Sequence, residues 1–222
     1  MYMYLVGGLI LLAVWAVLYL LRKDLRKEMW ITSLILTPFG ATEIFFVPHY
    51  WNPTTLFGWI PGIESFLLSF AVGGIAAVLY EFLLDRRLSK MRESKQVAHR
   101  HLIYLIVATV ASTIIFSFIF RRDYIYTMII SGFVGAIVIM FLRRDLIKDT
   151  IFGGLFFFVF YFLFTLLINV LFPGIFYRVW NLENLMGVFL LDIPLEELLW
   201  GLSAGMLIAP IYEYLRAYRV TD

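Results

Sequence analysis

Residues 151–172 read IFGGLFFFVFYFLFTLLINVLF, a run of 22 residues that contains no charged side chain. About 20 apolar residues in a helix cross the roughly 30 Å hydrocarbon core of a bilayer, so this run is long enough to span a membrane. Inside lipid, backbone polar groups must bond within the segment, and the run lacks the alternating polarity of a membrane β-strand. It therefore predicts a transmembrane α-helix.

Six further runs along the chain have a similar length and apolar character. The chain is 62% hydrophobic with a mean hydropathy of +0.89, a composition that a water-soluble fold of 222 residues cannot bury. The predicted fold class is an all-α integral membrane protein with seven transmembrane helices. The seven runs occupy residues 4–21, 29–47, 63–84, 102–120, 124–142, 151–172 and 194–215.

The charged residues and the missing cysteines exclude several classes of function. A net charge of only +2 argues against nucleic acid as a partner. The absence of cysteine excludes disulfides and thiolate metal sites, and we expect no bound metal. The first apolar run has no basic stretch before it and no small-residue cleavage site, so we expect a retained span rather than a signal peptide.

Lysine and arginine are distributed unevenly between the connections. The links after the first, third and fifth runs and the C-terminal tail hold 15 of the 18 basic residues, and the other links hold 3. Basic residues favour the cytoplasmic side of a membrane. We therefore expect a plasma-membrane protein with its N-terminus outside and its C-terminus in the cytoplasm, which requires an odd number of spans.

The chain also contains an internal repeat. Residues 21–28 (LRKDLRKE) recur 121 positions later as residues 142–149 (LRRDLIKD), in each case directly after an apolar run. Further along, residues 63–82 match residues 195–214 at an offset of 132. The first three runs thus repeat as the last three.

The repeat predicts the organisation of the whole chain. Residues 1–84 form a first three-helix repeat, residues 85–123 hold a cytoplasmic loop and a linker helix, and residues 124–222 form the second repeat. The extra crossing by the linker gives both repeats the same orientation, so we expect two parallel repeats related by an axis near the membrane normal.

Four glutamates lie inside apolar runs or at their outer ends: Glu43, Glu64, Glu196 and Glu197. A charged side chain in the bilayer costs several kcal/mol, so such residues indicate a functional site. The alternative for Glu64, Glu196 and Glu197 is that they cap helices, since acids favour the positive end of the helix dipole. For Glu81 and Glu213, near Arg86 and Arg216 at the cytoplasmic ends, we expect solvated ion pairs.

Small residues recur every four positions in the third and seventh runs, and such stripes let helices approach closely. If the two runs meet along these stripes, the acids at their outer ends share one cavity, lined by polar groups from Ser65, Asn169 or Asn181. Glu43 and Asn169 lie at similar depths in their runs. The stripes consist of Ser65, Ser69, Gly73 and Ala77, and of Glu197, Gly201, Gly205 and Ala209.

Residues 194–197 read Pro-Leu-Glu-Glu at the start of the last run. Together with two three-helix repeats joined by a linker helix, this resembles the membrane-integral lycopene cyclases, whose recurrent signature is Pro-x-Glu-Glu at that place. The resemblance is to the fused form of the family and covers essentially the whole chain. The first repeat departs from the pattern, because it reads Ile60-Pro61-Gly62-Ile63-Glu64-Ser65, with serine in place of the second acid.

The resemblance implies the ring closure of a linear carotenoid, an isomerisation without net redox change. A carboxylic acid protonates the terminal double bond, the neighbouring double bond attacks the resulting cation, and a base removes a proton. Glu196, Glu197 and Glu64 are the catalytic candidates, and aromatic faces stabilise the cation. The substrate-binding candidates are Glu43, Ser65, Asn169, Asn181, Trp51, Trp180 and Trp200, with Trp59 as a further aromatic.

No Gly-x-Gly-x-x-Gly motif occurs, so we expect no flavin or nicotinamide cofactor. The expected partners are the linear carotenoid and the lipid bilayer, and a homo-oligomer or other carotenoid-pathway enzymes are compatible further partners. A transporter or proton-coupled channel for a small hydrophobic or ionic solute remains the alternative, and a purely structural role is a third. An opsin-like photoreceptor is excluded because all five lysines fall in connections, where no Schiff base can form within the bundle.

The basic bias yields a topological prediction. Residues 47–62 and 173–193 lie outside and residues 85–100 lie in the cytoplasm. In a cysteine-free chain, a cysteine placed at Asn52 should react with an impermeant reagent added from outside, and one placed at Ser94 should not. The reverse pattern would invert the topology.

Overall fold

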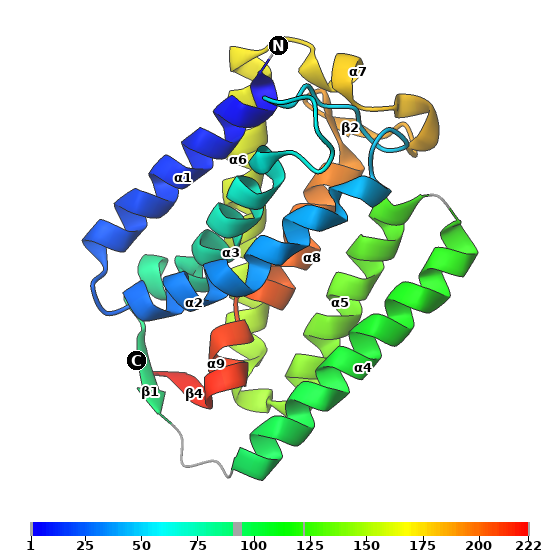
Figure 1. Ribbon diagram of the computed structural model, residues 1–222. Helices are drawn as coiled ribbons and strands as arrows, with labels where there is room; N and C mark the ends of the chain where they lie inside the picture. The colour runs from blue at the N-terminus through cyan, green and yellow to red at the C-terminus, as the bar shows by residue number, and fades with distance from the viewer. Residues whose placement is uncertain (1, 91–94, 122, 222) are drawn as a thin grey trace.

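The computed structural model describes residues 2–90, 95–121 and 123–221, and it is built almost entirely of helices (Figure 1). Ser94, the cytoplasmic labelling position, lies outside the described residues. The α-helices are α1 (Met3–Leu21), α2 (Arg26–Leu36), α3 (Ile63–Leu83), α4 (Lys95–Phe120), α5 (Tyr124–Leu142), α6 (Ile147–Leu171), α7 (Ile175–Val179), α8 (Leu195–Ile208) and α9 (Ile211–Arg216). The short 3₁₀ helices are η1 (Thr37–Phe45), η2 (Arg144–Leu146) and η3 (Leu182–Asn184), and the strands are β1 (Arg87–Lys90), β2 (Phe189–Leu190), β3 (Ile193–Pro194) and β4 (Tyr218–Thr221).

Six helical segments among the described residues are long and apolar enough to cross a bilayer. The expected all-helical membrane class is therefore confirmed, whereas the count of seven is not. The six segments are Met3–Leu21, Ile63–Leu83, Arg100–Phe120, Tyr124–Leu142, Arg144–Leu171 and Leu195–Arg216.

The predicted run 29–47 does not form one α-helix. α2 ends at Leu36 and the chain continues as the 3₁₀ helix η1, with Pro38 in its first turn. Proline has no N–H for the α-helical ladder and clashes with the carbonyl four residues earlier, so it breaks the helix here. Since 3₁₀ residues rise about 2.0 Å each, α2 and η1 together still extend roughly 34 Å, and a seventh crossing stays a prediction.

Gly73 and Gly205, one from each stripe of small residues, make close contacts, but not with each other. A Cβ placed on Gly73 would lie 2.8 Å from the Cβ of Leu36 on α2. A Cβ on Gly205 would lie 2.7 Å from the Cβ of Phe157 on α6. Gly73 and Gly205 therefore pack against helices of their own halves and not against each other, although α3 and α8 do approach one another.

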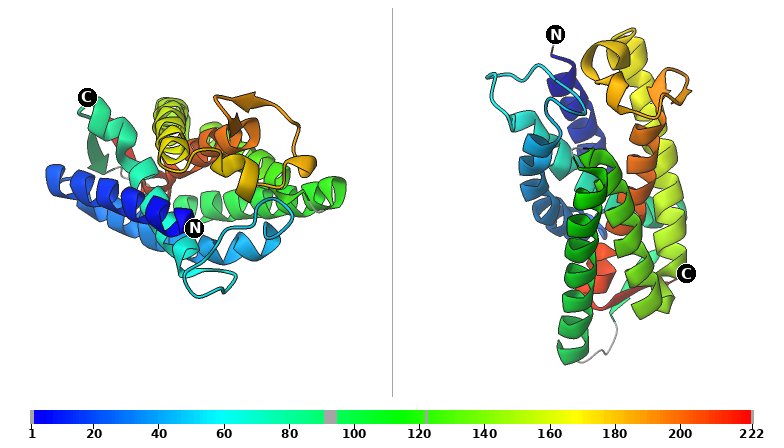
Figure 2. Two further views of the ribbon diagram at one scale, coloured as in Figure 1. Left: turned by 90° about the horizontal axis from the view of Figure 1, so that it is seen from above. Right: turned by 90° about the vertical axis from the view of Figure 1, so that its right-hand side faces the viewer.

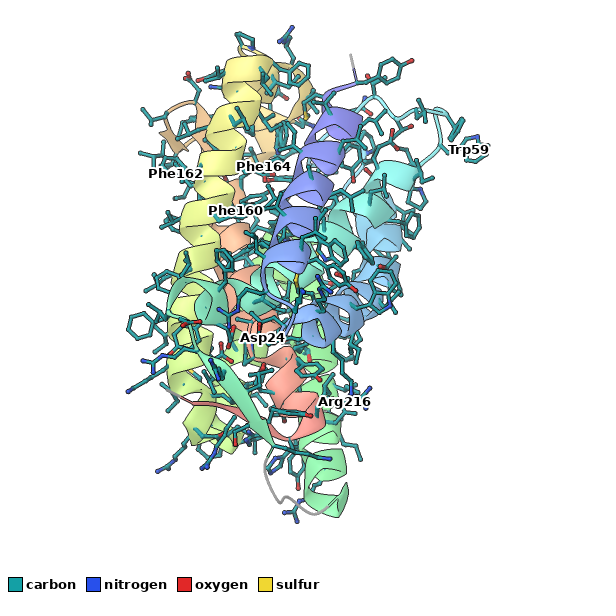
Figure 3. All side chains as sticks on the ribbon, turned by 90° about the vertical axis from the view of Figure 1, so that its left-hand side faces the viewer. Asp24, Trp59, Phe160, Phe162, Phe164 and Arg216 are labelled. Atoms are coloured by element: carbon teal, nitrogen blue, oxygen red, sulfur yellow. The ribbon has the colours of Figure 1, made fainter. Side chains whose placement is uncertain are left out.

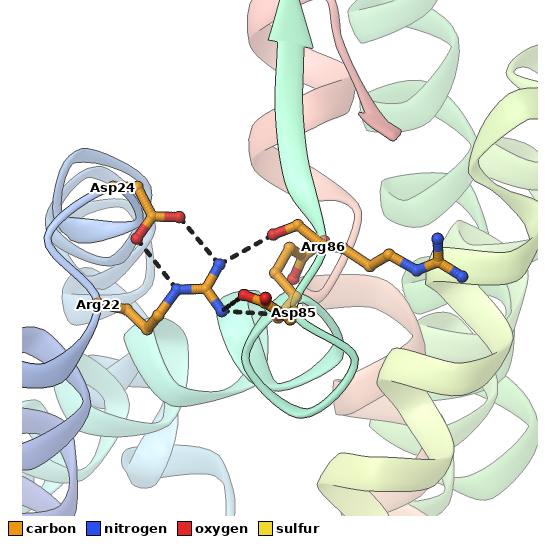
Figure 4. Close-up of polar contacts among 5 residues, drawn as sticks. Arg22, Asp24, Asp85 and Arg86 are labelled. Carbon is orange, nitrogen blue, oxygen red and sulfur yellow. Dashed lines mark hydrogen bonds and ion pairs between the residues drawn. The ribbon is translucent and has the colours of Figure 1, made fainter. Parts of the chain in front are cut away.

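A network around Arg22 closes the turn between α1 and α2 (Figure 4). The guanidinium donates to both carboxylate oxygens of Asp24, at 3.0 and 2.9 Å, and lies 3.2 Å from Asp85. It also donates to the carbonyl oxygens of Glu81 (3.0 Å) and Arg86 (2.9 Å). Its bonds to Asp24 lower the pKa of that carboxyl group, so Asp24 remains ionised.

Arg143 makes the corresponding contacts after α5. Its guanidinium donates to both carboxylate oxygens of Asp145, at 2.9 and 2.7 Å, and to the carbonyl oxygens of Glu213 (3.5 Å) and Tyr218 (2.7 Å). Arg143 and Asp145 lie 121 positions after Arg22 and Asp24. The carbonyls of Glu213 and Tyr218 lie 132 positions after those of Glu81 and Arg86, which bond Arg22. The packing pairs Gly73–Leu36 and Gly205–Phe157 have the same two offsets.

The two halves also pair through their backbones at both ends of the bundle. At one end β1 and β4 are antiparallel, and Leu88 is paired with Val220, the residue 132 positions later. At the other end Trp51 and Trp180 form an antiparallel bridge. The amide of Asn52 donates to the carbonyl of Val179 at 2.8 Å, and the amide of Asn181 donates to the carbonyl of Tyr50 at 2.9 Å. The N- and C-termini lie at opposite ends of the bundle (Figure 1).

α4 lies at the edge of the bundle beside α5, as both views of Figure 2 show. Its outward side chains are apolar and exposed, among them Ile106, Val110 and Phe118. An apolar face of this kind suits contact with lipid. On its inner side Leu105 of α4 is buried in a small core cluster with Ile139, Leu146 and Tyr214, so α4 packs against the second half.

Gly205→Ala should destabilise the protein, because even one methyl group would overlap Phe157. Overpacking of this kind costs about 1–3 kcal/mol, which thermal unfolding in detergent would detect. Gly8→Ala is the matched control, since a Cβ there meets its nearest neighbour at an ordinary 3.9 Å. Equal melting temperatures for the two variants would contradict the packing described here.

Candidate active site

The carboxyl group of Glu197 is held by three donors. Tyr50 (2.6 Å) and the indole N–H of Trp180 (2.8 Å) bond Oε1, and Tyr161 bonds Oε2 at 2.8 Å. Burial and the neighbouring Glu197 carboxylate raise the pKa of Tyr50 well above its usual value, so its hydroxyl stays protonated and donates. Glu197 is therefore an acceptor in all three bonds.

Glu196, the preceding residue on α8, is fully buried and anchored through one oxygen. Its Oε1 accepts hydrogen bonds from the hydroxyl of Tyr126 and the amide of Met186, both at 2.7 Å. Met186 lies in the segment between η3 and the short hairpin β2–β3, and this hairpin leads directly into α8. Within the described part of the chain, Oε2 of Glu196 is buried without a hydrogen-bond partner.

Glu64 occupies the corresponding place at the start of α3, 132 positions before Glu196. Its Oε1 accepts from the amide of Leu56 at 2.6 Å, and its buried Oε2 has no hydrogen-bond partner among the residues described. The two first-turn glutamates thus have the same arrangement, with one oxygen bonded to a loop amide and one left over. Helix capping alone would leave neither oxygen buried without a partner.

Glu43 lies against Ser65, the residue that replaces the second acid in the first half. Oε2 of Glu43 accepts from the Ser65 hydroxyl and from the amide of Gly62 at 2.8 Å. The 3₁₀ helix η1 can approach α3 this closely because a Cβ on Gly40 would lie only 2.7 Å from the backbone nitrogen of Phe66. A carboxyl group from a neighbouring helix therefore stands beside the position where the second half has Glu197.

Aromatic rings connect the two pairs of acids. Tyr4 lies beside Glu43 and Ser65, and its ring meets Trp51 edge-on at 4.6 Å. The rings of Trp51 and Trp180 are 5.4 Å apart, and Trp180 bonds Glu197. These rings connect Glu43 to Glu197, and Glu64 and Glu196 lie next to Ser65 and Glu197 in the chain, so we refer to the four acids and the side chains that contact them as the network.

Not every predicted site residue joins this network. Trp200 contacts Tyr161 at a ring distance of 5.1 Å, so it borders the site. Trp59 is 70% exposed and extends away from the bundle (Figure 3). The side chain of Asn181 is exposed, and its backbone amide, not its side chain, bonds the loop of Tyr50. Asn169 is half-buried on α6, and its side-chain oxygen bonds none of the described residues.

Four tyrosines of the network were not predicted: Tyr4, Tyr50, Tyr126 and Tyr161. Tyrosine is common at membrane interfaces, so three of them carry no signal in the sequence. Tyr161 is different, because it places a hydroxyl in the middle of a phenylalanine-rich run where lipid offers no partner. That hydroxyl indicated a buried acceptor.

No three histidine, aspartate or glutamate side chains within residues 2–90, 95–121 and 123–221 are placed to hold a metal ion. What the arrangement offers chemically is carboxyl groups in two settings. Glu197 accepts hydrogen bonds through both of its carboxyl oxygens, whereas Glu43, Glu64 and Glu196 each accept through one oxygen and keep the other buried without a partner among the described residues, so the adjacent acids Glu196 and Glu197 form a mixed pair. Such pairs suit a base and an acid acting side by side.

Comparison with known proteins identifies one family. The family model described as lycopene cyclase matches residues 123–215, which run from the start of α5 to α9 and include Glu196 and Glu197. No curated protein and no solved structure matches the chain.

Tyr161→Phe should destabilise the protein because it leaves a buried oxygen of Glu197 without a donor. The expected loss is about 1–3 kcal/mol in thermal or denaturant unfolding. Tyr177→Phe is the control, since it removes a tyrosine–aspartate bond of similar length (2.9 Å) at an exposed site. If both variants lose the same small amount, Tyr161 does not hold the Glu197 carboxylate.

Proposed function

We propose that the chain closes the end ring of a linear carotene by an acid-initiated isomerisation, because the lycopene cyclase family model matches residues 123–215. The observation that carries the mechanism is the pairing of Glu196, which keeps a buried oxygen without a partner, with Glu197, which accepts three hydrogen bonds. An acid and a base in one water-poor site are what such a reaction requires.

We further propose that the chain consists of two parallel three-helix repeats joined by α4, with seven crossings in all. The hinge bonds of Arg22 and Arg143, the packing of Gly73 and Gly205, and the two backbone pairings support this arrangement. Both pairings join matching positions, as an approximate two-fold axis through the ends of the bundle requires. That axis runs near the membrane normal, with the candidate site on the outer side.

In the proposed reaction Glu196 is the proton donor. Its free Oε2 carries the proton, which passes to the terminal double bond of the carotene and leaves a tertiary cation. The neighbouring double bond of the same chain attacks that cation and closes the ring. The new cation then loses a proton to the Glu197 carboxylate, so substrate and product have the same composition and no electrons leave the carotene.

The aromatic side chains of the network stabilise the cationic intermediates. The indoles of Trp51 and Trp180 lie against each other beside Glu197, and Trp200 lies against Tyr161. A cation over an aromatic face gains about 2 kcal/mol or more when water is excluded. Tyr50 and Tyr161 position the base through their hydrogen bonds to Glu197.

The first half contributes a less complete version of the same pair. Glu64 matches Glu196 in its surroundings, but the residue matching Glu197 is Ser65, and the nearest acid is Glu43 from η1. A hydroxyl is too weak an acid to replace a carboxyl group. We therefore assign the proton donor to α8, with Glu64 in a tuning or positioning role.

Replacing the acids with their amides should separate these roles. Glu196→Gln and Glu197→Gln should each lower cyclic product roughly 100- to 10,000-fold, the range for loss of general acid–base catalysis. Glu64→Gln should lose less, and Ser65→Ala least. The measurement is pigment extraction and chromatography from a lycopene-making host at matched membrane levels of each variant.

Glu183→Gln is the matched control, because Glu183 is an exposed glutamate of η3. It should keep full activity. If Glu196→Gln and Glu197→Gln also keep full activity, these glutamates are not the acid and base of the reaction. Movement of a solute across the membrane without a new pigment would favour a transporter instead.

A further inference from the structure

Four acidic side chains outside the candidate site, one each from α2, α3, α6 and α9, come together toward the end of the bundle that carries β1 and β4. Each is at most 1% exposed, and each interacts electrostatically with the other three. We call them the acid cluster, which consists of Glu28, Glu81, Asp149 and Glu213.

The acid cluster follows the offsets of the paired contacts. Asp149 lies 121 positions after Glu28, and Glu213 lies 132 positions after Glu81. Each half of the chain therefore supplies two members from matching places. The expectation of solvated ion pairs for Glu81 and Glu213 is wrong in one respect, since both carboxyl groups are fully buried.

None of the eight carboxyl oxygens in the acid cluster has a hydrogen-bond partner among the described residues. A buried ionised carboxylate without a partner costs several kcal/mol, and four in mutual contact would cost far more. Carboxylates can only accept hydrogen bonds, so these groups cannot satisfy one another while all are ionised. A carboxyl group that keeps its proton can donate to its neighbour, and Glu28 and Glu213 are close enough for this.

The two arginines that act on the acid cluster are also bonded to aspartates outside it. Arg22 acts on Glu81 and Arg143 on Glu213, but each guanidinium also forms two hydrogen bonds to an aspartate, Asp24 or Asp145. Each arginine charge is thus already matched by one carboxylate. The other ionisable groups near the acid cluster are Tyr80 with its neighbour Arg86, and Tyr212 with its neighbour Arg216.

We propose that the acid cluster is a proton-binding site, in which protons shared between facing carboxyl groups join the first half of the chain to the second. A proton fits better than a metal ion, because no group of acids among the described residues is placed to coordinate one. The site lies next to β1 and β4, so it responds to the pH at that end of the bundle. It is independent of the proposed cyclase chemistry.

The sign of the pH effect follows from proton linkage. The folded protein holds protons that the unfolded chain, with ordinary carboxyl groups, releases well below neutral pH. Stability therefore falls as the pH rises, which is opposite to the usual effect of acids in salt bridges. The melting temperature should therefore fall by about 4–8 °C between about pH 6 and pH 9.

Infrared difference spectroscopy of the purified full-length protein tests the proposal directly. The protonated-carboxyl C=O band at neutral pH should decrease in Glu28→Gln and in Glu213→Gln, and it should be unchanged in the exposed control Glu183→Gln. The two cluster variants should also melt at a temperature that depends less on pH than that of the parent chain.

If either cluster variant fails to fold, the pH dependence of the parent chain's melting temperature still tests the proposal. A melting temperature that rises or stays level from about pH 6 to pH 9 would overturn the proposal. So would folded cluster variants whose carboxyl band equals that of the parent chain. Stabilisation by added sodium, magnesium or calcium without any protonated-carboxyl band would replace the proton with a cation and would also overturn it.

Discussion

The antiparallel backbone pairing of the two halves is the interaction on which the rest of the structure depends. Two reciprocal hydrogen bonds join the segments of Trp51 and Trp180 at one end, and β1 pairs with β4 at the other. Backbone bonds of this kind cannot be replaced by lipid, and they fix which positions of the two halves face each other. Matching residues are therefore brought together, and both groups of buried acids lie where the halves meet.

The two groups of acids show two ways of keeping carboxyl groups inside a membrane protein. At the end of the bundle with the Trp51–Trp180 bridge, tyrosine hydroxyls, an indole and loop amides donate hydrogen bonds to the glutamates. In the acid cluster no such donors are present among the described residues. The protons that we propose for the acid cluster would lower the cost of burial there. The first arrangement suits catalysis and the second suits holding the halves together.

Much of the fold could be predicted from the sequence, because hydropathy gives the lengths of the membrane helices and the recurrence of residues 21–28 marks the charged turns that follow two of them. Which helices pack against each other could not be predicted. The spacing of Gly73 and Gly205 indicates that a backbone approaches closely, but it does not say which one, and both pack within their own halves. The second run breaks at Pro38. The apolar character of residues 29–47 predicts a single helix there in spite of this proline.

The candidate site could be predicted in part. Carboxyl groups in apolar runs are conspicuous, so Glu43, Glu64, Glu196 and Glu197 could be named. Their donors could not, because tyrosine at a helix end is as consistent with an interface anchor as with a buried hydrogen bond. The acid cluster was missed because Glu28 and Asp149 look like ordinary flanking charges until four helices are placed around them.

Isotope incorporation during ring closure tests the central claim of acid-initiated isomerisation most directly. Cells or membranes containing the protein and a linear carotene are incubated in D₂O, and the cyclic product is examined by mass spectrometry. The account predicts a product isomeric with its substrate in ordinary water, with one deuterium for each ring closed in D₂O. A cyclic product without deuterium, or one that differs from the substrate by two hydrogens, would contradict it.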